Sequence, residues 1–382
     1  MKMIYLDHAA STPVKRKALE VLNISMKEDF ANPSASHKFG KSIMKRVNEC
    51  RSGFLKMLNV SKGDNLVFTS SATEANNLAI NGLDLKEGDA VLFTPSDHPS
   101  LVEPVRGFEK IGVRARDFAC RKNGELDFNA IYEALDENVK LVVLAHVNNQ
   151  SGVIFQVMEI SEKIKKKNPG IHIHVDAVQS FTKMDIDLKK GVIDTLSFSS
   201  HKLGGPKGIA ALYVKKGTHL VPVFSGGGQE GGLRPSTLAA PLIFSFYEAS
   251  CEGISKLSRN LEKMEELKER TKCLLHEKIA GIIFPFEKMP TSPYILNVII
   301  PGISSDILLR HLEQKDIYVS STSACSSRVK GENAVFTALG IEQKYHKNVL
   351  RISFSPDTFF EEIAEFVREL SSIHNDLSRL MK

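Results

Sequence analysis

Two side chains that could carry chemistry stand at the ends of buried apolar runs. Asp176 closes the run at residues 171–175, where a carboxylate is costly unless it is paired. It could cap a helix N-terminus, or it could pair with a buried cation such as a protonated ring nitrogen. Lys202 lies between the apolar run 195–199 and a glycine-rich turn, where partial desolvation would lower its pKa and free the amine as a nucleophile. An aspartate for a pyridinium nitrogen and a lysine for a Schiff base are what pyridoxal phosphate requires.

A phosphate site is indicated at another strand-to-helix turn, which contains Ser71, Ala72 and Thr73. Free backbone N–H groups and hydroxyls favour an anion there, although an ordinary Ser/Thr helix cap explains this turn alone equally well. Further polar side chains that follow apolar runs could complete the site. Ser199 and His201 could donate to the phosphate, and His98 could stack on the cofactor ring.

The elements that must position these residues alternate between short apolar runs and segments of helical period. Strands are expected at residues 66–69, 90–93, 140–146, 171–176, 195–199 and 209–214, and helices at 73–81, 100–111 and 158–167. Such alternation is typical of an α/β domain with a mostly parallel sheet. Ligands of open α/β sheets bind beyond the carboxyl ends of the strands, where all the polar spots above fall.

A second, smaller α+β domain is expected after residue 250. A long charged helix is predicted at 254–279, followed by strands at 294–300 and 349–354 and helices at 305–314 and 358–380. The expected division is a large domain at 15–257 and a small domain that combines 1–14 with 258–382.

Composition narrows the class of protein. The chain has 382 residues, of which 42% are hydrophobic and 25% charged, so it can bury a sizeable core. A net charge of +5 is too mild to indicate a nucleic-acid partner. No apolar stretch is long enough for a membrane span and no signal sequence begins the chain, so a cytoplasmic protein is expected.

Five scattered cysteines without a CxxC motif indicate a reducing compartment rather than a disulfide framework or a zinc cage. Cys325 differs from the other four because it lies in a run of small polar residues, 320–327, which is typical of a mobile loop. It is the cysteine most suited to chemistry, and no metal site is expected.

The motifs resemble a known family. SFSSHKLGGPKG, HVDAVQS, FTSSATEANNLAI, HVNNQSG, YLDHAASTP and NPSASHKFG are similar to the class V aminotransferase group, and VSSTSACSSR followed by LRISFS resembles cysteine desulfurases of the NifS/IscS type. The resemblance runs from Tyr5 to Arg351. It implies a pyridoxal-phosphate homodimer of the aspartate-aminotransferase fold (fold type I). It also implies that L-cysteine is converted to L-alanine, while the sulfur becomes a persulfide on an enzyme cysteine.

The resemblance also implies a role for each matching residue. Lys202 would form the Schiff base, Asp176 would pair with the ring nitrogen, Gln179 would bind the ring hydroxyl, and His98 would stack on the ring and act as acid/base. The cofactor phosphate would be held at the turn 71–73 by Thr73, with Ser199, His201 and, from the other subunit, Thr237. Asn149, also beside the cofactor, and Arg351 would bind the substrate carboxylate, for which the arginine fork is suited. Cys325 would accept the sulfur.

The chain departs from the family pattern near the expected phosphate. Ser71 and Ser200 stand where many relatives have Gly, Gln150 where Glu is frequent, Gly231 where a basic or bulky residue is common, and Pro235-Ser236 where Ser-Gly is common. Added side chains there could alter the approach of the backbone to the phosphate, so a reduced cofactor affinity is one expectation.

Several alternatives stay open at this point. Selenocysteine lyase, or another class V pyridoxal-phosphate enzyme, shares most motifs, and a non-catalytic assembly partner is a further reading. The sulfur acceptor could be an iron–sulfur scaffold or a tRNA-thiolation protein. Gly226, Gly228 and Gly231 match GxGxxG, but Pro235 follows where a dinucleotide site needs a helix. His172 and His174 share a strand face without an evident third metal ligand.

Overall fold

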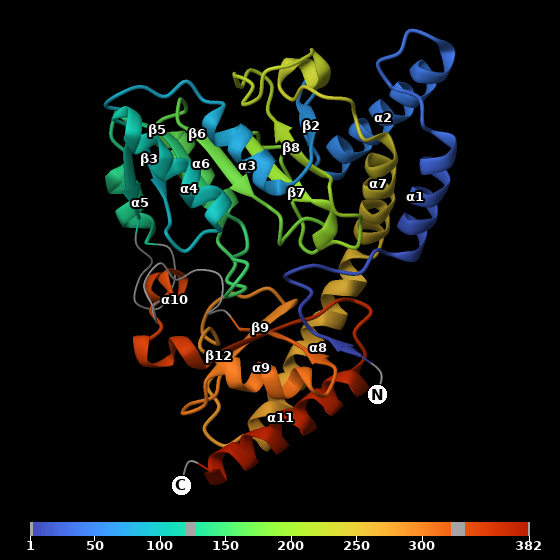
Figure 1. Cartoon of the computed structure of the whole chain (residues 1–382). Helices are drawn as coiled ribbons and strands as arrows, with labels where there is room; N and C mark the ends of the chain where they lie inside the picture. Colours follow the sequence, from blue (N-terminus) through green and yellow to red (C-terminus); the bar gives the residue numbers. More distant parts are fainter. Residues whose placement is uncertain (1–2, 119–126, 322–332, 381–382) are drawn as a thin grey trace.

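The computed structural model describes residues 3–118, 127–321 and 333–380. Its larger part is a seven-stranded sheet in the order β2-β8-β7-β6-β5-β3-β4 (Figure 1). The strands are β2 (Asn65–Thr69), β3 (Ala90–Phe93), β4 (Arg114–Asp117), β5 (Val139–Ala145), β6 (His172–Asp176), β7 (Thr195–Ser199) and β8 (Ala210–Val214). Only β8 of these runs against the others, because it pairs antiparallel with both β2 and β7. The carboxyl ends of β2, β3, β5, β6 and β7 therefore meet at one edge.

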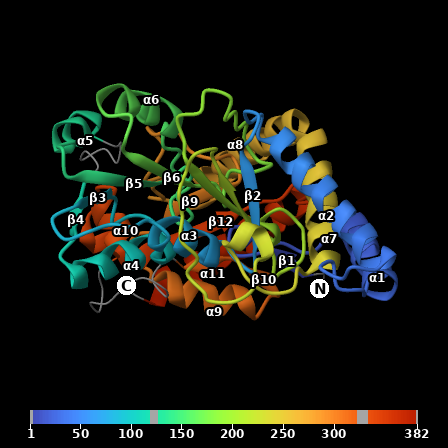
Figure 2. The same ribbon diagram turned by 90° about the horizontal axis from the view of Figure 1, so that it is seen from above.

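Helices cover both faces of this sheet, as Figures 1 and 2 show. Alternate residues of β5 point to opposite faces: Leu141 and Val143 join one apolar cluster, and Val142 and Leu144 join another. The first cluster includes side chains of α4 (Pro99–Gly107), beside α3 (Ala72–Asn81). The second includes α2 (Lys38–Met57), α6 (Val157–Lys167), α7 (Ala240–Ser255) and the short α5 (Phe128–Ala134), while α1 (Arg16–Glu28) packs along α7. Burial on both faces explains why the inner strands are near-continuous apolar runs, whereas the edge strand β4 has the polar sequence RARD and no buried residue.

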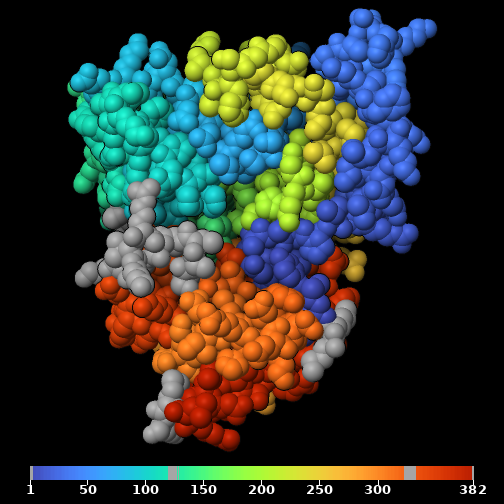
Figure 3. All heavy atoms as spheres, viewed as in Figure 1, coloured from blue at the N-terminus to red at the C-terminus, as the bar shows by residue number. Residues whose placement is uncertain are grey.

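A second core lies around a smaller antiparallel sheet of β11 (Ser320–Ser321), β12 (Val349–Ser353) and β9 (Ile295–Ile299). Its helices are α8 (Leu257–Lys278), α9 (Ser305–Glu313) and α11 (Phe360–Leu380), whereas α10 (Ala334–Ala338) packs Val335 and Phe336 into the apolar core of the large sheet. The start of the chain joins this part, because β1 (Ile4–Tyr5) pairs with β10 (Ile317–Tyr318). In Figure 3 the N-terminal segment lies between the two parts of the molecule.

The expected α/β class with an added α+β part is confirmed, and the expected strands are observed within a residue or two. The prediction of one long helix at 254–279 is wrong at its start. Residues 254 and 255 end α7, and α8 begins only at Leu257 after a break at Lys256. The helix expected at 100–111 continues past Gly107 as a 3-10 turn, Phe108–Ile111. The proposed domain bounds stay a prediction.

Within the described ranges, none of the helices is both long and apolar enough to cross a membrane.

Candidate active site

The polar residues singled out in the sequence come together at the carboxyl edge of the large sheet. Lys202 lies in the 3-10 turn Ser200–Lys202 that follows β7, and Asp176 is the last residue of β6. His98 precedes α4 after β3, Asn149 follows β5, and Thr73 lies in the first turn of α3 after β2. Because these five strands run in one direction, their carboxyl ends bring the five residues to one site.

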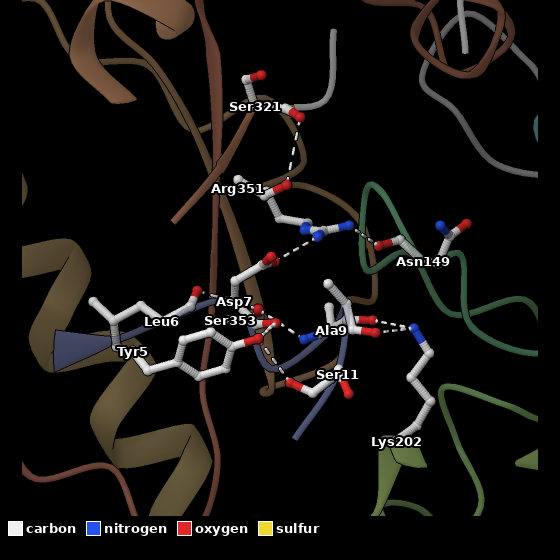
Figure 4. Close-up of polar contacts among 12 residues, drawn as sticks. Tyr5, Leu6, Asp7, Ala9, Ser11, Asn149, Lys202, Ser321, Arg351 and Ser353 are labelled. Atoms are coloured by element: carbon white, nitrogen blue, oxygen red, sulfur yellow. Dashed lines mark hydrogen bonds and ion pairs between the residues drawn. The ribbon is translucent and has the colours of Figure 1, made fainter. Parts of the chain in front are cut away.

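The Lys202 amine points at the N-terminal segment of the chain (Figure 4). Its Nζ donates to the carbonyls of Ala9 and Ala10, each at 2.7 Å. Burial, followed by the charge of Arg351, lowers the pKa of Lys202 to about 8. A larger fraction of neutral amine at neutral pH is what a Schiff-base nucleophile requires.

Asp176 is buried and held by a polar network on the α3 face of the sheet. Its Oδ2 accepts from Asn76 Nδ2 at 2.9 Å, and its Oδ1 accepts from the Val178 N–H at 2.8 Å. The Asn76 Oδ1 in turn contacts His174 Nε2 at 3.0 Å. The residues after Asp176 form turns rather than a helix, so the helix-cap reading of this aspartate is wrong. Asn76 therefore holds the Asp176 carboxylate from the side of the sheet that α3 covers.

The turn before α3 is a capped helix N-terminus. Ser71 Oγ accepts from the Glu74 N–H at 3.1 Å, and Glu74 Oε2 accepts from the Ser70 N–H at 2.7 Å, which is a capping box displaced by one residue. Glu74 also pairs with Arg234, Nε to Oε1 at 2.7 Å, and so ties the turn to the glycine-rich loop after β8. Thr73 is exposed and Ala72 half-buried. Capping and anion binding are compatible, because the first N–H groups of a helix remain available to an anion.

His98 precedes α4 at the edge of the site, and the residue is partly open to solvent. Its Nδ1 accepts from the Ser100 N–H at 3.1 Å, which caps α4. Protein packed around the imidazole lowers its pKa, as does Lys202, whereas Asp176 raises it. A neutral His98 has Nε2 left for a proton or a ring contact. The preceding Asp97 is buried, and burial together with Asp176 raises its pKa well above its usual range.

Arg351 reaches the site from β12 of the smaller sheet (Figure 4). Its Nη2 pairs with Asp7 Oδ1 at 2.7 Å, and its Nη1 donates to the Asn149 carbonyl at 2.9 Å. Its Nε is buried and lacks a partner in the part of the chain that is described. The guanidinium is thereby fixed between the two sheets, at the position from which a substrate carboxylate could be bound.

Gln179 lies in the turn after β6 and is buried. Its Nε2 donates to the Ala9 carbonyl at 2.9 Å, so this carbonyl accepts from both Gln179 and Lys202. Ser199 is buried at the end of β7. His201 contacts Ser11 Oγ through Nδ1 at 3.3 Å, and burial and Lys202 lower its pKa to about 4. A neutral His201 can donate a single hydrogen bond to an anion.

Thr237 is exposed in the loop that precedes α7. This loop is anchored by Glu230, whose Oε1 pairs with Arg51 Nη2 at 2.6 Å and whose Oε2 accepts from the Phe68 N–H at 2.6 Å. No described contact joins Thr237 to the turn 71–73 of the same chain, and its expected role from a second subunit stays a prediction.

Two of the sequence departures have visible structural effects. Ser236 adopts φ +117°, a conformation that favours glycine. Ser200 Oγ is buried and has no hydrogen-bond partner among the described residues. It lies so close to Gly205 that a Cβ built on this glycine would be only 2.1 Å from it. Gln150, in contrast, is satisfied by Asn333 Nδ2 at 3.0 Å.

Cys325 lies outside the described residues, and so does Cys120. The strand that leads toward Cys325 is fixed, because Ser320 pairs with Arg351 and Ser321 with Leu350.

Sequence reasoning missed three residues of the site: Asn76, Asp7 and Glu74. Asp7 and Asn76 lie within quoted motifs, YLDHAASTP and FTSSATEANNLAI, but nothing in their spacing shows which partners they meet. Glu74 had a local signal, since a Ser-x-x-Glu pattern before an apolar run predicts a capping box.

The paired histidines of β6 are structural. His172 and His174 both contact Thr195 Oγ1 at 2.9 Å, and burial lowers their pKa to about 4 and about 3. No cluster of metal-ligating side chains occurs in the residues that the structure describes.

Residues 4–366 match the family model of class-V aminotransferases, and the chain belongs to this family. A relative from Encephalitozoon cuniculi, a mitosomal cysteine desulfurase, is 33% identical over 95% of this chain and 84% of its own. A solved NifS-like protein aligns with a TM-score of 0.90 at 28% identity, covering 97% of this chain and 99% of its own. A structure of SspA in complex with cysteine aligns with a TM-score of 0.81 at 30% identity, covering 93% and 100% of the two chains.

Proposed function

We propose that this protein is a pyridoxal-phosphate-dependent cysteine desulfurase, which converts L-cysteine to L-alanine and transfers the sulfur to Cys325. The observation that carries the proposal is that Arg351, from the smaller sheet, comes close to Lys202 and Asp176 at the carboxyl edge of the large sheet, in a chain of the class-V aminotransferase family. The resemblance to relatives named as cysteine desulfurases supports the choice of substrate.

The residues present fit the cofactor. Asp176 is a buried carboxylate without a cationic side chain in contact among the described residues, and its two hydrogen bonds come from neutral donors. It would hold a protonated ring nitrogen, while Gln179 would hold the ring hydroxyl. Thr73, Ser199, His201 and the N–H groups of the turn 71–73 would hold the phosphate, with Thr237 from a second subunit. When bound, the cofactor supplies a Schiff-base carbonyl and an electron sink.

The protein's own side chains would bind the substrate carboxylate and transfer protons. Arg351, with Asn149 beside it, would bind the substrate carboxylate through its fork. Lys202, as a neutral amine, would take the proton from the substrate Cα. His98 could hold the proton of the substrate thiol or of Cys325, because its Nδ1 is occupied by Ser100 and its Nε2 is free to exchange a proton.

The sulfur step concerns Cys325. Its thiolate attacks the substrate sulfur, so a bond forms between Cys325 Sγ and that sulfur while the substrate Cβ–S bond breaks. The electron pair of the broken bond goes to Cβ, which takes a proton, and the product is alanine. A thiol of ordinary pKa is only a few per cent thiolate at neutral pH, so a base such as His98 is needed.

We propose further that the enzyme acts as a homodimer in the cytoplasm and passes its persulfide to an acceptor protein. The family resemblance supports the dimer, because it implies that the exposed Thr237 reaches the phosphate of a second subunit. An iron–sulfur scaffold and a tRNA-thiolation protein are both suitable acceptors.

The test combines spectroscopy with product analysis. The protein incubated with pyridoxal phosphate should be yellow, and L-cysteine with a thiol reductant should yield sulfide and alanine in equal amounts. Lys202→Ala should remove both the covalent cofactor and the products. Cys325→Ala should keep the bound cofactor and lose sulfide release, whereas Cys273→Ala, at an exposed cysteine of α8, should behave as wild type. A colourless protein would overturn the enzyme assignment, and unchanged sulfide release by Cys325→Ala would overturn the role of Cys325.

A further inference from the structure

A cavity of about 360 Å³ lies between the two parts of the molecule, behind the catalytic lysine. Its walls come from the N-terminal segment, the turn after β6 and the start of β9, and they include His8, Lys183 and Tyr294. Among the residues that the structure describes, Lys202 is the one that this cavity shares with the site built above, because Asp176, His98, Asn149 and Arg351 do not line it. We call it the Lys183 pocket.

Lys183 is a buried base without a counter-charge. Its exposure is 8%, and its Nζ meets Gln179 Oε1 at 3.5 Å and lies 5.5 Å above the Tyr294 ring. Among the described residues, no carboxylate forms an ion pair with it. Burial and the nearby Lys202 lower the pKa of Lys183 to about 7. A buried ammonium is costly unless an anion pairs with it, so this position is primed for a negative group.

His8 is a second buried base on the same cavity. Its exposure is 7%, and its Nδ1 is buried with no hydrogen-bond partner in the described chain. Burial and the charge of Lys183 lower the pKa of His8 to about 4. His8 and Lys183, two basic residues from different segments, thus line the same cavity. The pKa of each is lowered because it is buried and no anion is paired with it.

The other charged groups around the pocket lie nearer its rim. Asp357 and Arg16 are exposed, and Lys15 and Glu362 are half-buried. Glu362 accepts from the Phe359 N–H at 3.0 Å, and the charge of Asp357 acts on Lys15. Neither carboxylate contributes to the pKa of Lys183. The inner wall is therefore basic, whereas the rim carries both signs.

We propose that the Lys183 pocket binds a small organic carboxylate, with the carboxylate at Lys183 and His8 and an apolar body against Tyr294, Val14, Leu203 and Phe354. The volume suits a ligand of about ten heavy atoms, and the mixed apolar and polar lining is that of a ligand site. The pocket adjoins the proposed desulfurase site through Lys202 and through the contact of Lys183 with Gln179, but the binding of a carboxylate there does not require desulfurase chemistry.

The charge arrangement gives binding a proton signature. A bound anion stabilises the protonated forms of Lys183 and His8, so the protein must take up protons when the ligand binds near pH 8, where free Lys183 is mostly neutral. The share of the uptake that is due to Lys183 should decline as the pH falls below about 7, where Lys183 is already protonated, whereas His8 can still take up a proton down to about pH 4.

Isothermal titration of protein saturated with pyridoxal phosphate tests the site, with benzoate as the probe and two buffers of different ionisation enthalpy at pH 8. We expect one benzoate to bind per chain with net uptake of protons. L-alanine should not displace the bound benzoate. Lys183→Met should weaken binding at least tenfold, and Val14→Trp, which fills the pocket from its wall, should do the same. Lys189→Met removes an equal charge from an exposed position and should leave affinity unchanged.

Three results would overturn the proposal. They are the absence of benzoate binding to the wild-type protein, equal affinities for wild type and a folded Lys183→Met, and displacement of benzoate by L-alanine, which would locate it at Arg351. Melting temperature and cofactor absorbance establish that each variant is folded. Failure of the desulfurase assignment would show instead as missing sulfide release, with benzoate binding intact.

Discussion

The buried pair between Glu230 and Arg51 predicts how strongly the glycine-rich loop is anchored. The Glu230 side chain is 1% exposed and accepts from both Arg51 Nη groups, at 2.8 Å and 2.6 Å, and from the Phe68 N–H at 2.6 Å. Glu230→Ala leaves a guanidinium that is 17% exposed without its counter-charge and a buried N–H without its acceptor. Breaking one side of a buried pair costs about 3–5 kcal/mol.

The cost can be converted into a melting temperature. At about 2.1 cal/mol/K per residue, a chain of this length unfolds with an entropy of about 0.8 kcal/mol/K, so a loss of about 4 kcal/mol lowers Tm by about 5 °C. Differential scanning calorimetry measures the shift. Glu49→Ala removes an equal carboxylate from an exposed i,i+4 pair, Lys45–Glu49 at 3.9 Å, and should change stability by about 0.5 kcal/mol at most.

Glu230→Gln separates charge from shape, because its amide keeps one acceptor but turns two donors toward Arg51. It should fall between wild type and Glu230→Ala. A Tm for Glu230→Ala within 1 °C of the Glu49→Ala control would refute the reasoning, since the pair would then contribute no more than a surface one. Equal Tm values for Glu230→Gln and wild type would show that the charge is irrelevant to the anchor.

Three further changes have expected outcomes. Ser236→Gly should raise stability by about 1 kcal/mol in urea unfolding, because φ +117° is strained for serine; an unchanged midpoint would contradict this. Ser200→Ala should be neutral or stabilising by about 1 kcal/mol, because it removes a buried hydroxyl without a partner in the described structure; a loss of stability would show that the hydroxyl is satisfied. The binding of pyridoxal phosphate to the cofactor-free protein, measured by absorbance, should become faster as the pH rises through about 8, because deprotonation of Lys202 supplies the neutral amine. Lys202→Ala should abolish this pH-dependent binding. An inflection above pH 10 would contradict a lowered pKa of Lys202.

Six of the seven strands of the large sheet could be predicted because they are buried and carry their signal in a short apolar run, whereas the edge strand β4, with the sequence RARD and no buried residue, was missed. The exact bounds of 90–93 and 195–199 are examples. The break between α7 and α8 could not be seen in the same way, because residues 254–257 continue the helical period across it. β1 and β10 were also missed, since two-residue strands are defined by their partner across 313 positions of sequence, Ile4 to Ile317, and not by local pattern.

The site was predictable to the extent that its residues follow strands. Asp176, Lys202 and His98 were found in this way, because parallel strands carry their carboxyl-terminal residues to one edge. Arg351 was found only through resemblance, since it is in the middle of a strand in another sheet. Asn76 could not be found, because a buried amide on a helix has no local signature and shows its purpose only when Asp176 and His174 are seen on either side of it.

The N-terminal segment 4–11 links the two halves of the site, which neither sheet could do alone. Its strand β1 belongs to the smaller part through β10, and Ser353 Oγ accepts from the Ala9 N–H at 2.9 Å. The same few residues place Asp7 on Arg351 and the Ala9 carbonyl on both Gln179 and Lys202. A shift of this segment would therefore move Arg351, the proposed ligand of the substrate carboxylate, relative to Lys202, the proposed Schiff-base lysine. The spacing of these two side chains therefore depends on the six residues of irregular chain that follow β1, 6–11, and on their burial and hydrogen bonds, because neither sheet carries both side chains.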